Sequence, residues 1–117
     1  MLGKTIWLGE DSVWLEMIGE FRDADYAGYC EDFQFDVLEN TSEKLNVVLD
    51  IRSLTHTDNS YIDFAPLDKL IRHKNVDKFI FAVDTVLELF PLQSISDSDN
   101  IFCWAGNYTE LQDLLCS

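Results

Sequence analysis

The sequence predicts a single α/β domain over residues 1–117, with a mixed, mostly parallel sheet of about five strands covered by helices. Three observations favour this fold class. Strand-like and helix-like segments alternate along most of the chain, which is typical of parallel sheets. Two of the strand segments are apolar at nearly every position, as expected of strands covered on both faces. A length of 117 residues with 47% hydrophobic side chains is enough for one core, and no repeat or linker marks a second domain.

The first elements are a predicted β-hairpin and a helix. Segments 5–9 and 13–19 predict two short strands around a turn, with Trp7 and Trp14 available to the core. A helix is predicted over 22–40, with Asp23 as its N-cap. Its buried face is given by four residues at helical spacing, Tyr26, Cys30, Phe33 and Val37.

The remaining segments alternate between strands and helices. Residues 45–51, "LNVVLDI", are rich in β-branched side chains and predict a buried strand. The later elements are predicted as helix (63–74), strand (78–83), short helix (84–90), strand (100–104) and helix (107–115). The order is therefore strand, strand, helix, strand, helix, strand, helix, strand, helix. We expect strands 45–51 and 78–83 to be adjacent, with neither at an exposed edge of the sheet.

Charge and cysteine content narrow the classes of partner. The chain carries 22 acidic against 8 basic residues, a formal net charge of −14, which disfavours binding to nucleic acid. Residues 10–43 hold eleven acids and a single base, whereas a basic island is formed by Lys69, Arg72, His73, Lys74 and Lys78. This distribution suits a protein partner with a basic face. Three cysteines without a CxxC pair favour reduced thiols in the cytoplasm, where we expect the protein to reside.

Motifs for catalysis, cofactors and metals are missing from the sequence. It has neither the GxGxxG nor the GxxxxGK[ST] phosphate-binding motif, and no apolar run of the roughly 18 residues that span a bilayer. "SDSDN" (96–100) lacks the glycine and the distal glutamate of a calcium loop. His56, Asp58 and Ser60 are of the residue types of a catalytic triad but lie too close along one loop to converge. We therefore expect no enzyme activity, no catalytic residues, no metal and no cofactor.

The segment "THTDNS" (55–60) follows the buried strand 45–51 and leads into a helix. If Ser60 capped that helix, Pro66 would be its sixth residue and would break a backbone hydrogen bond at a cost of about 3 kcal/mol. A helix that starts near Asp63 instead places Pro66 in its first turn, where the missing donor is unpaired anyway. Ser60 is then expected in an exposed loop. His56 is expected to be a structural residue.

The order and spacing of these elements resemble the STAS domain, the fold of anti-sigma factor antagonists, over essentially the whole chain. "VVLDIRSLTHTDNSY" has the layout of the family's strand and serine-containing loop, and "KFIFAV", "VLELFPL" and "NIFCW" fall where the family has its next elements. The resemblance implies a regulatory module that binds a protein partner, such as an anti-sigma kinase, and is released by phosphorylation of a loop serine. By position, the family's loop corresponds to Asp58, Asn59, Ser60 and Tyr61 in this chain. The resemblance implies that Ser60 corresponds to the serine that is phosphorylated in the family.

Other interpretations remain open at this stage. The segment is also consistent with a polar turn that merely ends a buried strand, and this interpretation is preferred to a phosphorylation switch. "LDIRSL" and "LIRHKNVDKFIFAV" also resemble the SEC14-like STAS branch, which implies a lipid or small hydrophobic ligand. A third class, an acidic mimic of nucleic acid, is disfavoured because the fold resemblance accounts for the chain without it. The sequence does not define the oligomeric state.

Overall fold

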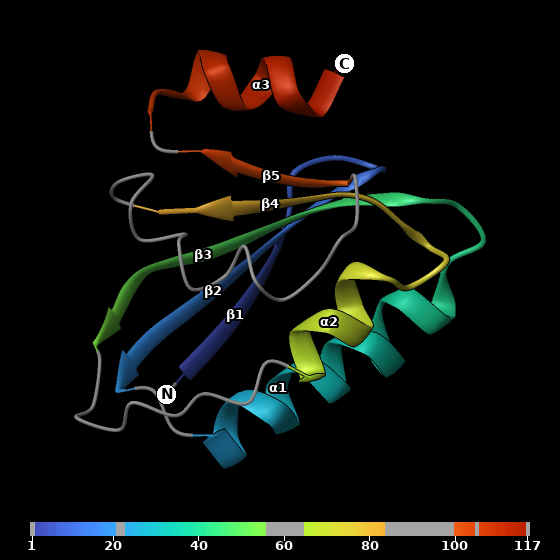
Figure 1. The fold of residues 1–117 in the computed structure, drawn as a ribbon. Coiled ribbons are helices and arrows are strands. Elements are labelled where there is room, and N and C mark those ends of the chain that lie inside the picture. Colours follow the sequence, from blue (N-terminus) through green and yellow to red (C-terminus); the bar gives the residue numbers. More distant parts are fainter. Residues whose placement is uncertain (1, 21–22, 56–64, 84–99, 105, 117) are drawn as a thin grey trace.

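A computed structural model describes residues 2–20, 23–55, 65–83, 100–104 and 106–116. Five strands lie side by side in the order in which they occur along the chain (Figure 1). They are β1 (Leu2–Trp7), β2 (Ser12–Glu20), β3 (Leu45–Thr55), β4 (Val76–Ala82) and β5 (Ile101–Trp104). β1 runs antiparallel to β2, and every later pair is parallel. The predicted hairpin, the predicted parallel sheet and the adjacency of the two apolar strands are all confirmed.

Helices cover both faces of the sheet (Figure 1). One face carries α1 (Asp23–Asp36), the 3₁₀ helix η1 (Leu38–Asn40) and α2 (Ala65–Ile71), and the other carries α3 (Tyr108–Cys116). Pro66 lies in the first turn of α2, as predicted. The short helix predicted at 84–90 lies outside the described residues, as do residues 96–99 of "SDSDN". Within the described residues, no helix combines the length and apolar composition needed to cross a membrane.

The larger core lies between the sheet and the helices α1 and α2. Tyr26, Cys30 and Phe33 of α1 are buried there, which confirms the predicted helix face. The helix predicted over 22–40 is interrupted, because α1 ends at Asp36 and η1 follows. The side-chain amide of Asn40 donates hydrogen bonds of 3.0 Å to the carbonyl oxygens of Phe35 and Asp36. These bonds satisfy carbonyls that the end of α1 leaves without backbone partners.

The smaller core lies between the sheet and α3. It contains Trp14, Val48, Ile80, Ala82, Trp104 and Leu111. Val47, Val48 and Leu49 are each fully buried, so β3 is covered on both faces and lies inside the sheet, as predicted.

The prediction that Trp7 joins the core is wrong. Trp7 is 51% exposed, although its cross-strand neighbour Val13 is fully buried. β1 is an edge strand, and the helices that cover the inner strands leave the end of this edge open to solvent. Trp14, on the inner strand β2, is 7% exposed and confirms the other half of the prediction.

Polar contacts fix both ends of α3. At its start, the side-chain oxygen of Asn107 accepts a 3.1 Å hydrogen bond from the backbone N–H of Glu110, which is an N-cap contact. At its end, the Lys78 ammonium donates to the Leu114 carbonyl at 2.6 Å, and the Asn46 amide donates to the Leu115 carbonyl at 3.3 Å. A cation at a helix C-terminus also interacts favourably with the helix dipole. α3 is therefore anchored to β3 and β4.

Candidate functional site

The site predicted from sequence, the loop of Asp58, Asn59, Ser60 and Tyr61, lies outside the described residues, and so does His56. The structure describes β3, the strand that leads into this loop. Two polar residues in the middle of β3, Asp50 and Arg52, face a groove on the side of the sheet that α3 covers only in part.

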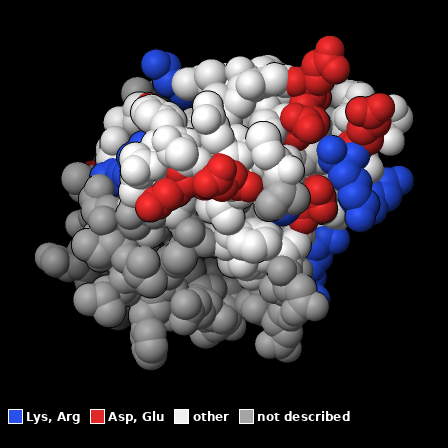
Figure 2. Space-filling view, turned by 90° about the horizontal axis from the view of Figure 1, so that it is seen from above, with Lys and Arg blue, Asp and Glu red and all other residues white. Residues whose placement is uncertain are grey.

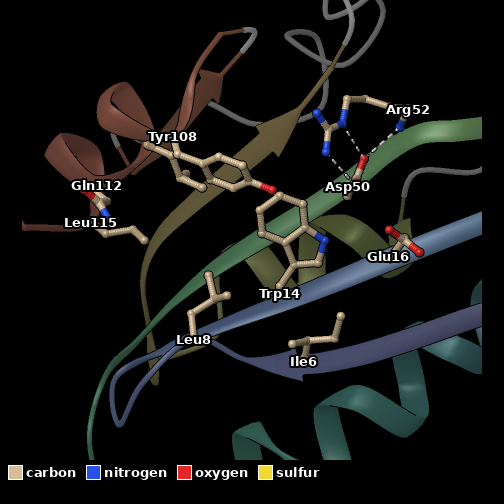
Figure 3. A pocket seen from close by; sticks show the side chains of 10 residues that line it. Ile6, Leu8, Trp14, Glu16, Asp50, Arg52, Tyr108, Gln112 and Leu115 are labelled. Carbon is tan, nitrogen blue, oxygen red and sulfur yellow. Dashed lines mark hydrogen bonds and ion pairs between the residues drawn. The ribbon is translucent and has the colours of Figure 1, made fainter.

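We call this feature the α3 groove; it has a volume of about 430 Å³ and opens between α3 and the β1–β2 hairpin (Figure 3). Ile6 and Leu8 line it on the hairpin side, and Trp14 lies between them and α3. Its other lining residues are Glu16, Asp50, Arg52, Tyr108, Leu111, Gln112 and Leu115. The groove thus has mostly apolar walls and a polar end.

The strand register explains why these residues share one face. Ile6 of β1 lies opposite Trp14 of β2, and Glu16 of β2 lies opposite Asp50 of β3. Because side chains alternate between the faces of a strand, positions two apart along β2 point the same way. Trp14 and Glu16 therefore place an aromatic ring and a carboxylate side by side in the groove.

An irregularity in β3 positions the polar end. Between the pairs Glu16–Asp50 and Ile18–Ser53, β3 contains one residue more than β2, which is a β-bulge. The backbone N–H of Arg52 is thereby directed at Oδ1 of Asp50, at 3.0 Å. The Arg52 side chain adds two further bonds of 3.0 Å, from Nε to Oδ1 and from Nη2 to Oδ2. The nearly buried carboxylate of Asp50 is thus paired bidentately, which is the strong geometry for an arginine–carboxylate pair.

Aromatic rings hold the Arg52 side chain from two sides. Its guanidinium carbon lies 5.8 Å from the centre of the Trp14 ring and 5.2 Å from that of Trp104. The two indoles meet edge to face at 6.0 Å, and the Trp104 N–H donates to the Asn107 carbonyl at 2.8 Å. Cation–π contacts of this kind favour a fixed side-chain position. Arg52 therefore connects the inner end of the groove to the start of α3.

The rim of the α3 groove exposes large apolar side chains. Ile6 is 46% exposed, Leu8 44% and Tyr108 70%. The Tyr108 ring lies 5.9 Å from that of Trp104, so the aromatic surface continues from the buried core to the rim. A contiguous exposed apolar surface with a polar margin is typical of a site for a protein or another ligand.

The residues that line the α3 groove include no cysteine, serine or histidine, and no cluster that could hold a metal ion occurs among the described residues of the chain. Cys30 lies in the other core, where burial raises the pKa of its thiol to about 12, so this thiol is not poised as a nucleophile.

Three members of the predicted basic island are engaged with other parts of the chain. Arg72 pairs with Asp68 at 3.0 Å, His73 lies 3.4 Å from Glu39, and Lys78 binds α3. Hydrogen bonds from Gln34 and His73 lower the pKa of the Glu39 carboxyl. Lys69 and Lys74 are exposed. The basic surface that is open to a partner is therefore smaller than the five basic residues in the sequence suggest.

Comparison with known proteins bears on the fold. No family model and no curated protein matches the chain. One similar solved structure is that of an uncharacterised protein of the DUF3478 family with a SpoIIAA-like fold, from Shewanella loihica PV-4. The two agree with a TM-score of 0.66 at 12% sequence identity, over 97% of this chain and 92% of that chain. The chain therefore has a SpoIIAA-like fold, in agreement with the fold that its sequence predicted.

Proposed function

We propose that this protein is a non-enzymatic regulatory module that docks a protein partner in the α3 groove. The observation that carries the proposal is the exposure of Ile6, Leu8 and Tyr108 around a groove whose inner wall is Trp14. Burial of these side chains by a partner would contribute about 25 cal/mol for each Å² of apolar surface removed from water, and this contribution offsets the entropy cost of association. The rim of the groove is exposed at Ile6, Leu8 and Tyr108, which suits contact with the side chains of a protein segment.

The proposal is tested by affinity purification from the native host with wild-type, Leu8→Ser and Phe35→Ser baits. Phe35 provides a matched control because it is an exposed apolar residue, 57% accessible, on α1 at the other face of the sheet. We expect a partner that is retained by the wild type and by Phe35→Ser but depleted with Leu8→Ser. Recovery of the same proteins with all three baits would contradict docking in the groove.

The loop serine gives this module a proposed means of regulation. β3 contributes Asp50 and Arg52 to the groove, and the segment that contains Ser60 follows β3 in the sequence. The resemblance to anti-sigma factor antagonists supports the idea that phosphorylation of Ser60 releases the partner. Asp58, Asn59 and Tyr61 are proposed to contact the partner beside it.

A second candidate function is the binding of a lipid or another small hydrophobic ligand. It is favoured by the volume of the α3 groove, about 430 Å³, which falls within the range of small-molecule sites. Native mass spectrometry of the purified protein separates the two candidates. A stoichiometric lipid adduct that disappears in Leu8→Ser would support the ligand, whereas a bare chain together with partner capture would support protein docking.

A further inference from the structure

We infer that the segment seated in the α3 groove carries lysine or arginine beside its apolar residues; this inference rests on the proposed function and specifies the chemistry of the partner. The reason is the distribution of charge around the groove. Glu16 lies in the groove, and the exposed Glu10 and Asp11 form the hairpin turn that follows Leu8. The α3 residues that line the groove, Tyr108, Leu111, Gln112 and Leu115, carry no charge, so the charge of the groove comes from the strands and the hairpin.

The basic residues on this side do not cancel the acidic ones. Arg52 is bound bidentately to Asp50, so this pair contributes little net charge. Lys4 lies opposite Glu16 in the strand register, but the ion pairs among the described residues join Arg52 to Asp50, Arg72 to Asp68 and His73 to Glu39. The Glu16 carboxylate, half-buried beside Trp14, is therefore available to a cation from outside.

Figure 2 views the side of the molecule that carries α3. One group of acidic side chains lies amid uncharged surface there, whereas others lie beside lysine or arginine side chains. An apolar segment that carried carboxylates would meet like charges here, whereas one that carried cations would be attracted. The formal net charge of −14 strengthens this preference, because the field of the whole chain steers cations toward it.

Trp14 adds no contact for the incoming cation, because the Arg52 guanidinium already lies over its ring and the side chain is only 7% exposed. Glu16 lies two residues further along β2 on the same face and is partly exposed. The groove thus combines apolar walls with one position suited to a positive charge.

The test uses two synthetic amphipathic peptides of about four helical turns with the same leucine face, one with lysine and one with glutamate on the polar face. Isothermal titration measures their binding to wild type, to Glu16→Gln and to Glu31→Gln. Glu31 is the matched control because it is an exposed glutamate on α1, at the other face of the sheet. Circular dichroism verifies that each variant is folded.

We expect the lysine peptide to bind the wild type about tenfold more tightly than the glutamate peptide, and more weakly as salt is added. Glu16→Gln should reduce that ratio about threefold, the effect of one partly exposed ion pair, while Glu31→Gln leaves it unchanged. Equal binding of the two peptides, or equal effects of the two substitutions, would overturn the inference.

A third variant separates this inference from the proposed function. If the two peptides bind equally and Leu8→Ser weakens both, the groove still docks an apolar segment, and only the preference for cations is wrong. If Leu8→Ser leaves both peptides unaffected, or if neither peptide binds the wild type, docking in the groove is contradicted as well.

Discussion

The hydroxyl of Tyr29, on α1, donates a hydrogen bond of 2.8 Å to the carbonyl oxygen of Lys4, on the edge strand β1. The Tyr29 ring lies over Gly3, where a β-carbon would overlap it. Burial raises the pKa of this phenol, while its contact with Thr5 lowers it. Tyr29 therefore occupies part of the sheet edge that strands of other molecules could otherwise pair with.

The first prediction concerns this contact. Gly3→Ala should lower the free energy of unfolding by about 1–3 kcal/mol, because the added methyl group displaces the Tyr29 ring. In a Tyr29→Ala background the same substitution should cost little. Urea denaturation of the four proteins measures this coupling. Gly9→Ala is the control, because no atom lies within 4 Å of its β-carbon position. Additive effects of the two substitutions would contradict the contact.

The second prediction concerns pH. Burial raises the pKa of Cys30 from 9.0 to about 12, so the folded state holds the proton more tightly than the unfolded chain. The associated stability is fully present below pH 9 and is lost as pH rises toward 12. Between pH 8 and 10.5 the wild type should lose about 2 kcal/mol more than Cys30→Ala. Tyr29 is present in both proteins, so the comparison cancels the effect of burial on its pKa, but the coulombic effect of Cys30 on Tyr29 is lost in the variant. Parallel stability curves for the two proteins would show that the Cys30 thiol is not protected.

The third prediction concerns the Asp50–Arg52 pair. Arg52→Met should lower the free energy of unfolding by about 3 kcal/mol, because it leaves the Asp50 carboxylate buried without its bidentate partner. Arg72→Met, which removes the exposed pair with Asp68, should cost less than about 1 kcal/mol. Thermal unfolding followed by circular dichroism compares the two variants. Equal losses would mean that burial of Asp50 adds nothing to the pair.

The fourth prediction concerns Ser60. A phosphate there adds a charge of about −1.5 to −2 in a segment that already contains Asp58 and Asp63. We therefore expect Ser60→Asp to weaken the binding of a captured partner, with Ser60→Ala close to wild type. Isothermal titration at low salt measures the three affinities. Tight binding by Ser60→Asp would leave the loop as a polar turn without a regulatory role.

Much of the fold could be predicted because its signals are local. The apolar run of β3 requires cover on both faces, and the spacing of Tyr26, Cys30 and Phe33 marks one side of a helix. The exposure of Trp7 could not be predicted in this way. It depends on how far α1 and α2 extend over the edge strand, which is a property of the tertiary packing.

The α3 groove was missed at the sequence level for a similar reason. The groove exists because α3 covers only part of its face, and its polar end depends on a register shift between β2 and β3. The sequence offered one signal for this polar end, which is an acidic residue two positions before an arginine in an otherwise apolar strand. Asp50 and Arg52 are close in sequence, but only the bulge directs the N–H of Arg52 at the carboxylate.

The bulge also limits how the loop after β3 could be exchanged. After the bulge, Ser53, Leu54 and Thr55 pair with Ile18, Gly19 and Glu20. This register is shifted by one residue from the register before the bulge, in which Asp50 pairs with Glu16. If a segment from another protein were joined before Arg52 without the extra residue of the bulge, the register of the strand would shift by one residue. Side chains that should face one side of the sheet would then face the other. In an engineered chimera, Arg52 and the residue before it belong to the scaffold, and the earliest safe junction is Ser53.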